Sequence, residues 1–218
     1  MTGLIPYNTF TMRNIISNNC LMSFYYKENA LGAFPTPFAW CRLSAVDMSN
    51  LILNFYHINW AHITLRHGSE VPNTIEDKKD RYAIIIDNKI IARYTHIVFN
   101  EKCIQPSVIE NDILYNKPWE LIASNYIRRV NRMISLNKSP AFIYMDDYQR
   151  CDTIDDIKTL IDSAYIAKLP LLIFTKRDIT TGNDWTRIIS KANGLEVCDF
   201  TYILTNFKEE IVNLINSN

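Results

Sequence analysis

Glycine is scarce in this sequence, at five of 218 residues. Neither the GxGxxG fingerprint of dinucleotide-binding folds nor the GxxxxGK[ST] loop of P-loop proteins occurs. A glycine-rich loop that brings the backbone close to a phosphate is therefore excluded. Long flexible glycine linkers between domains are excluded as well.

The sequence also lacks an excess of charge of either sign and any paired cysteine motif. It has 23 Lys and Arg against 23 Asp and Glu, so we expect no nucleic-acid partner. The five cysteines form no CxxC pair, which argues against a zinc knuckle or a thioredoxin-type site. No apolar run approaches the roughly 18 residues of a membrane span, and no basic-then-apolar leader opens the chain. We expect a reduced, cytoplasmic protein that does not span a membrane.

Strand and helix patterns alternate along the chain, and 48% of the residues are hydrophobic, enough for a sizeable core. Apolar segments typical of strands occupy residues 12–17, 61–67, 141–145 and 169–174. Asp87-Asn88 predicts a hairpin between strands at 82–86 and 89–99. Helical patterns occupy residues 21–29, 44–56, 119–136 and 153–168.

The C-terminal region predicts a helix over 184–192, a strand over 196–204 and a final helix capped by Asn206. Ser44 and Asp47 are suited to cap the helix over 44–56, and the segment from Thr153 to Asp156 resembles a capping signal for the helix over 153–168. An apolar stripe along that helix is predicted from Val46, Ser49, Leu53 and Tyr56. These elements together predict one three-layer α/β/α domain over residues 1–218, with a mixed, largely parallel sheet and one β-hairpin.

The stretch from residue 13 to residue 20 has the pattern of a strand-to-helix turn. Two isoleucines end a strand, Ser17, Asn18 and Asn19 form a polar turn, and Cys20 precedes a helical segment. Asn tolerates the backbone angles of sharp turns. Ligands of parallel sheets bind at the carboxyl ends of strands, where a helix N-terminus lowers a thiol pKa. Cys20 is therefore a candidate nucleophile, and the alternative is a small buried hydrophobic residue.

Opposite charges gather in two later segments. Residues 117–138 hold five bases and one acid, whereas residues 146–156 hold five acids and one base. Arg128 and Arg132 share a helical face, and Arg129 lies about 100° around the helix. Two arginines on one face can grip a phosphate or carboxylate in fork geometry. A solvated face, or internal pairing with the acidic segment, is the alternative.

A general base and an acid are needed if Cys20 is a nucleophile. The first three histidines are five residues apart, share no helix or strand face, and predict no metal site. His96, which falls on a predicted strand, is the candidate base, and a structural hydrogen-bonded histidine is the alternative. Asp146 and Asp147 end a predicted strand and are candidate acids, because neighbouring carboxyls repel and one can stay protonated. Helix capping is the competing interpretation of these two residues.

The segment Ile15 to Cys20 resembles the opening motif of a bacterial family of unknown function that carries the label exopolysaccharide biosynthesis protein. Pro37 to Trp40, and Asn125 to Met133 followed by the strand Ala141 to Met145, are similar to a related family labelled papain-like cysteine peptidase. The resemblance covers residues 13–176. It implies cysteine-dependent chemistry on surface polysaccharides. We expect no cofactor and no metal ion.

The resemblance also bears on the substrate site and on the base. The aromatic Trp40 is the substrate-binding candidate within its motif. Both families tend to place a histidine after the position of Phe99, where this chain has Asn100 and Glu101. The base is therefore left open between His96, Glu101 and neither.

Two classes of function follow from these residues. In a cysteine hydrolase or acyl transferase, Cys20 attacks, His96 takes its proton, and the amides of residues 17–19 hold the oxyanion. In a non-hydrolytic sugar- or nucleotide-sugar-binding protein or transferase, Arg128 and Arg132 bind an anion and Cys20 is structural. Both classes imply a carbohydrate or a phosphorylated small molecule as the ligand.

Overall fold

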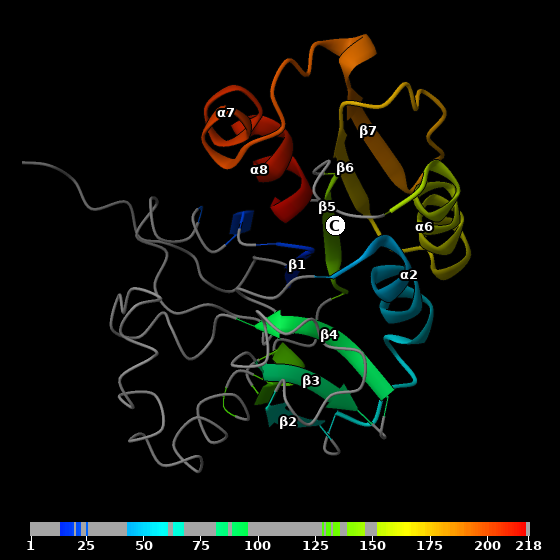
Figure 1. Ribbon diagram of the computed structural model, residues 1–218, viewed down its shortest axis with the longest axis vertical. Helices are drawn as coiled ribbons and strands as arrows, with labels where there is room; N and C mark the ends of the chain where they lie inside the picture. Colours follow the sequence, from blue (N-terminus) through cyan, green and yellow to red (C-terminus); the bar gives the residue numbers. More distant parts are fainter. Residues whose placement is uncertain are drawn as a thin grey trace, which may run out of the picture.

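Four parallel strands, in the order β1-β5-β6-β7, form a sheet at the centre of the structure (Figure 1). The computed structural model describes residues 14–19, 21–22, 25, 43–60, 63–67, 82–86, 89–95, 128, 130–131, 133–135, 139–146 and 152–216. The strands are β1 (Ile15–Ser17), β5 (Ala141–Asp146), β6 (Leu171–Thr175) and β7 (Thr186–Ser190). Their register places Asp146 beside Thr175, and Thr175 beside Ser190. An α/β fold with a parallel sheet, as predicted, is confirmed.

Helices cover both faces of this sheet (Figure 1). One face carries α2 (Ala45–Asn54) and α6 (Ile154–Ala167), and the other carries α7 (Phe200–Asn206) and α8 (Lys208–Asn216). None of the helices in the described ranges combines the length and apolar character that crossing a bilayer requires.

Side chains of β5 alternate between two apolar clusters, one on each face of the sheet. Phe142 and Tyr144 pack with α2 and α6. Ile143 and Met145 pack with α7 and α8. Successive residues of a strand point to opposite faces, and a strand buried on both faces is apolar throughout. Each fully buried large apolar side chain contributes about 1.5–3 kcal/mol of transfer free energy.

Two helices begin at capping boxes that the sequence predicts. At α2, the amide of Asp47 donates to Ser44 Oγ over 3.0 Å, and the amide of Ser44 donates to the Asp47 carboxylate. At α6, Thr153 and Asp156 make the same reciprocal pair. The helix α6 ends at Lys168, which adopts a left-handed backbone with φ 52°. Each cap satisfies amides that have no partner within the helix.

The prediction of which side of α2 is buried is wrong. Val46, Leu53 and Tyr56 are exposed, whereas Ser49 is buried. The buried face of α2 is formed instead by Ala45, Met48, Ser49, Leu51 and Ile52. Those residues face β5 and α6, which decide the buried side of the helix.

β3 (Tyr82–Ile86) and β4 (Lys89–Thr95) pair antiparallel, on either side of residues 87–88, where the hairpin is predicted. These strands form a second sheet with β2 (Ile63–His67), in the order β2-β3-β4. Within the described ranges, the parallel sheet holds no antiparallel strand. The mixed sheet that we predicted is therefore two sheets, one parallel and one antiparallel.

The C-terminal region differs from the sequence prediction in three elements. Residues 186–190 form β7, followed by the short 3-10 helix η4 (Lys191–Asn193), where a helix over 184–192 was predicted. Residues 200–206 form α7, where the predicted strand over 196–204 is wrong. Asn206 ends α7 and donates to the Tyr202 carbonyl over 2.9 Å, so it does not cap the final helix as predicted. Parallel pairing with β6 forces the extended backbone of β7 despite its helical pattern.

Candidate functional site

The turn after β1 is fixed to the neighbouring strand by one asparagine side chain. Asn18 is fully buried. Its Oδ1 accepts from the amide of Met145 over 2.9 Å, and its Nδ2 donates to the carbonyl of Met145 over 2.9 Å. The Asn18 amide donates to the carbonyl of Ile143 over 3.0 Å. A side chain that satisfies both main-chain groups of one residue holds the turn in place against β5.

Asn19 joins this turn to the helical segment that follows. Its Oδ1 accepts from the amide of Leu21 over 3.0 Å, as in an N-cap, and Leu21 has helical backbone geometry. Ser17 Oγ donates to the carbonyl of Asn19 over 2.6 Å. The Asn19 side chain is almost fully buried, and its Nδ2 has no hydrogen-bond partner. A buried hydrogen-bond donor without a partner thus lies at the carboxyl end of β1.

This geometry corrects one part of the predicted oxyanion site. The sequence assigns that role to the amides of residues 17–19, yet the Asn18 amide is already bonded to Ile143. The Nδ2 group of Asn19 is a donor that sequence reasoning did not identify. The structure identifies it because the Asn19 side chain is buried, with its Oδ1 hydrogen-bonded and its Nδ2 without a partner.

Several predicted site residues lie outside the described part of the chain: Cys20, Trp40, His96, Glu101, Arg129, Arg132 and Asp147. Whether the thiol, the imidazole and an acid meet in one place stays a prediction. Arg128 is described, lies on a helical segment, and is exposed. It makes no ion pair with any described acid.

Asp146, the predicted acid, lies at the carboxyl end of β5 in a buried ion pair. Its Oδ2 accepts from Arg177 Nε over 2.8 Å and from Thr175 Oγ1 over 2.7 Å. The Asp146 side chain is fully buried and the Arg177 side chain is 17% exposed. The carboxylate oxygen Oδ2 is therefore committed to two donors from the end of β6, and a role as an orienter of His96 stays a prediction.

Arg177 and Asp152 extend this network to both helices of the same face. Arg177 Nη2 donates to the carbonyl of Asp152 over 2.6 Å. The Asp152 carboxylate accepts from the Tyr144 hydroxyl over 2.6 Å and from the amide of Ala45, the first residue of α2, over 3.2 Å. These bonds fix the first turn of α2, the end of β5 and the loop before α6 to one another.

The described acids between 146 and 156 thus have structural partners. Asp155 contacts Lys158 at the surface over 3.1 Å. The amide of Thr153, and then its hydroxyl, donate to Asp156 and hold the pKa of that carboxyl below its ordinary value of 3.8. Asp156 caps the N-terminus of α6, whereas Asp146 forms an ion pair with Arg177.

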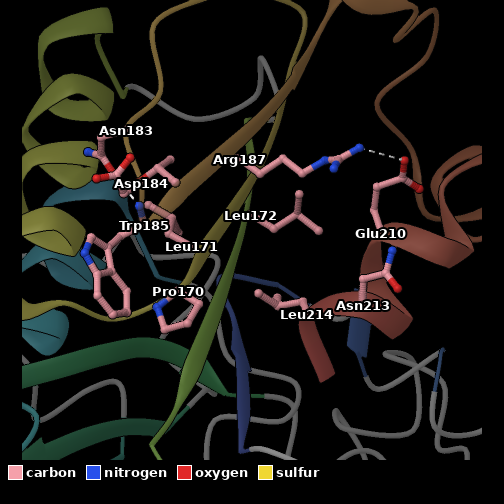
Figure 2. A pocket seen from close by; sticks show the side chains of 11 residues that line it. Pro170, Leu171, Leu172, Asn183, Asp184, Trp185, Arg187, Glu210, Asn213 and Leu214 are labelled. Atoms are coloured by element: carbon pink, nitrogen blue, oxygen red, sulfur yellow. Dashed lines mark hydrogen bonds and ion pairs between the residues drawn. The ribbon is translucent and has the colours of Figure 1, made fainter. Parts of the chain in front are cut away.

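Two hollows lined by described residues lie at the opposite, amino edge of the parallel sheet. The first, of about 250 Å³, lies beside Pro170 and Trp185, which precede β6 and β7. Figure 2 shows Arg187 of β7 reaching across it to Glu210 of α8, over 3.2 Å. The second, of about 370 Å³, lies beside Asn14 and Ser139, which precede β1 and β5.

No protein-family model, curated protein or solved structure matches this chain. The resemblance to the exopolysaccharide and peptidase families therefore stays a prediction from the residues. Among the described side chains, no group of His, Cys, Asp and Glu is arranged to hold a metal ion.

Proposed function

We propose that this protein is a cysteine-dependent hydrolase or acyl transferase of surface-polysaccharide metabolism, formed by a single three-layer α/β/α domain in the cytoplasm. The observation that supports it is the turn at residues 17–19. Asn18 fixes that turn to β5, and Asn19 begins the helical segment. In the sequence, Cys20 directly follows Asn19 and precedes Leu21. A thiol at the start of a helix is activated by the N-terminal field.

The proposed chemistry uses the chain's own groups throughout. The Cys20 thiol passes its proton to His96, and the sulfur attacks the carbonyl carbon of an acyl ester on a carbohydrate. The C–O bond breaks, and the leaving hydroxyl takes the proton from His96. His96 then takes a proton from water, or from a hydroxyl of a second sugar, and that oxygen attacks the thioester carbon. The C–S bond breaks, and the sulfur takes the proton back from His96. Asn19 Nδ2 donates to the developing oxyanion in both steps.

Rates of thiol labelling against pH test the nucleophile directly. Iodoacetamide labelling, resolved by peptide mass spectrometry, should show Cys20 reacting fastest of the five cysteines, with an apparent pKa below the free-thiol value of about 8.5. Cys198 is the internal reference, because its sulfur is partly buried and lies 3.7 Å from the Phe174 carbonyl. Cys20 labelling at the rate of Cys198 would overturn the proposal.

Esterase assays on an acetylated sugar supply the second readout. Cys20→Ser and Cys20→Ala should both abolish turnover, whereas Cys198→Ala should leave it unchanged. Asn19→Ala should lower kcat by about 100-fold with KM nearly constant, because it removes a donor used mainly in the transition state. Unaltered turnover in Cys20→Ala would refute cysteine catalysis.

The alternative function is a non-hydrolytic sugar- or nucleotide-sugar-binding protein or transferase. The exposure of Arg128, without an acidic partner among the described residues, favours it. This function predicts that Cys20→Ala still binds a sugar phosphate, and that Arg128→Ala weakens that binding. Loss of sugar-phosphate binding in Cys20→Ala alone would oppose it.

A further inference from the structure

The hollow of about 370 Å³ lies at the amino edge of the parallel sheet, at the other end of β1 from the turn at residues 17–19. Its described lining consists of one amide, three aromatic side chains, two apolar side chains and one hydroxyl: Asn14, Phe55, Tyr56, Trp60, Met133, Ile134 and Ser139. The residues come from four separate parts of the chain. None of them carries a charge.

Asn14, which lines this hollow, has a buried hydrogen-bonding atom without a partner. Its side chain is 1% exposed. Nδ2 donates to the carbonyl of Met133 over 3.0 Å, and this bond fixes which end of the amide is oxygen. The remaining oxygen, Oδ1, is buried and has no hydrogen-bond partner. A buried acceptor without a donor carries a desolvation cost, which a bound donor would relieve.

Aromatic rings form one wall of the hollow. The Phe55 and Trp60 ring centroids are 5.1 Å apart, and the Phe55 and Tyr56 centroids are 5.6 Å apart with the planes nearly perpendicular. Tyr56 is 63% exposed and Ile134 is 49% exposed, so apolar surface remains open to a ligand at the rim. The Tyr56 hydroxyl donates to Ser139 Oγ over 3.2 Å, which leaves the serine hydroxyl proton available.

We propose that this hollow binds an uncharged pyranose sugar. The aromatic wall would face the C–H groups of the ring, which are apolar. A sugar hydroxyl would donate to Asn14 Oδ1, and another would accept from Ser139. The absence of charge in the described lining disfavours a phosphorylated ligand. The volume falls within the range of about 300–1,000 Å³ that is typical of small-molecule sites.

Saturation-transfer NMR with four probes tests the ligand class. Methyl β-D-glucopyranoside and methyl β-D-galactopyranoside represent neutral pyranoses, cyclohexanol an apolar ring with one hydroxyl, and glucose 6-phosphate a charged sugar. At least one methyl pyranoside should bind, and more tightly than cyclohexanol and glucose 6-phosphate. No pyranoside binding, or tighter binding of either comparison probe, would overturn the proposal.

Single-residue variants test whether the pyranoside binds in this hollow. Tyr56→Ala should weaken pyranoside binding at least fivefold, and its exposure makes folding secure. Tyr165→Ala is the matched control, because Tyr165 is a similarly exposed tyrosine on α6 and should leave binding unchanged. Asn14→Ala should abolish binding. If Asn14→Ala does not fold, the test of the site depends on Tyr56→Ala. Equal pyranoside affinity in Tyr56→Ala and wild type would refute the site.

This inference is independent of the proposed cysteine chemistry. Cys20→Ala should bind the pyranoside with unchanged affinity. Slow labelling of Cys20 would therefore not contradict the pyranose site. An absence of pyranoside binding would not contradict the role of Cys20 as nucleophile.

Discussion

Replacing Arg177 by Met should be among the most destabilising single changes in the described structure. The substitution keeps an apolar stem of similar length and removes the guanidinium. That group donates to Asp146 Oδ2 over 2.8 Å and to the Asp152 carbonyl over 2.6 Å. Asp146 is fully buried, so its carboxylate would lose its cationic partner away from water.

The expected loss of stability follows from that burial. Removing one partner of a buried ion pair costs about 3–5 kcal/mol, whereas an exposed pair is worth about 0–1 kcal/mol. Arg177→Lys should lose less than Arg177→Met, because an ammonium keeps the charge but cannot span both acceptors in fork geometry. The double variant Asp146→Asn with Arg177→Met should be more stable than the sum of its single variants predicts, because no charge stays unpaired.

Urea denaturation of wild type, the three single variants and the double variant measures these differences. The midpoint should fall with an unchanged m-value, since the surface exposed on unfolding is nearly constant. A domain of this kind has a stability of about 5–15 kcal/mol, so the single variant should lose a large share of it. A loss below about 1 kcal/mol for Arg177→Met, or strict additivity in the double variant, would refute the buried-pair reasoning.

Three further changes test the same part of the molecule. Asn18→Ala should cost about 2–4 kcal/mol in urea denaturation, because it leaves both main-chain groups of Met145 without partners; a loss below about 1 kcal/mol would contradict the anchoring role. Tyr144→Phe should cost about 1.5–3 kcal/mol, since the hydroxyl donates to a buried carboxylate over 2.6 Å; an unchanged midpoint would argue against that bond. The pKa of Asp156 is lowered by folding, so its stabilising effect is present above 3.8 and is lost as pH falls below that value through the folded pKa. Thermal unfolding of wild type and Asp156→Ala should therefore differ at pH 6 and converge at the acidic end, and a difference that does not depend on pH would refute this linkage.

The central strands were predictable because strands buried on both faces of a sheet have continuous apolar sequences. Ala141 to Met145 is an unbroken apolar run, which is typical of a strand enclosed between helices. The capping boxes of α2 and α6 were predictable for a similar reason, since the cap and its partner are three residues apart in the sequence. In these cases all the determining residues lie within one short segment.

Prediction failed where distant partners decide the conformation. Thr186–Ser190 has a pattern that also suits a helix, and its extended state depends on pairing with β6. Phe200–Asn206 is rich in β-branched and aromatic residues, yet it is a helix because Asp199 caps it and because Ile203 and Leu204 pack on the sheet. Propensity is a weak signal that tertiary packing overrides.

The candidate site was predictable in part. The polar turn at residues 17–19 and the acid at the end of β5 stand out in the sequence because they follow apolar strands. Arg177 was missed, although it follows β6 in the same way that Asp146 ends β5. The register that pairs Asp146 with Thr175 is what brings Arg177 to the carboxylate, and no short segment encodes that register.

The partners of the acids limit where an anionic ligand can bind at the carboxyl edge. Helix N-termini attract anions through amides that lack partners. At α2, the amide of Ala45 is bonded to Asp152, and at α6 the amide of Thr153 is bonded to Asp156. A phosphate or oxyanion would have to displace carboxylates that belong to the chain, and their negative charge would repel it. Among the described residues, Asn19 Nδ2 is a buried donor at this edge that no such carboxylate occupies. The chemistry of this edge is therefore expected at the turn beside Cys20, rather than at the N-termini of α2 and α6.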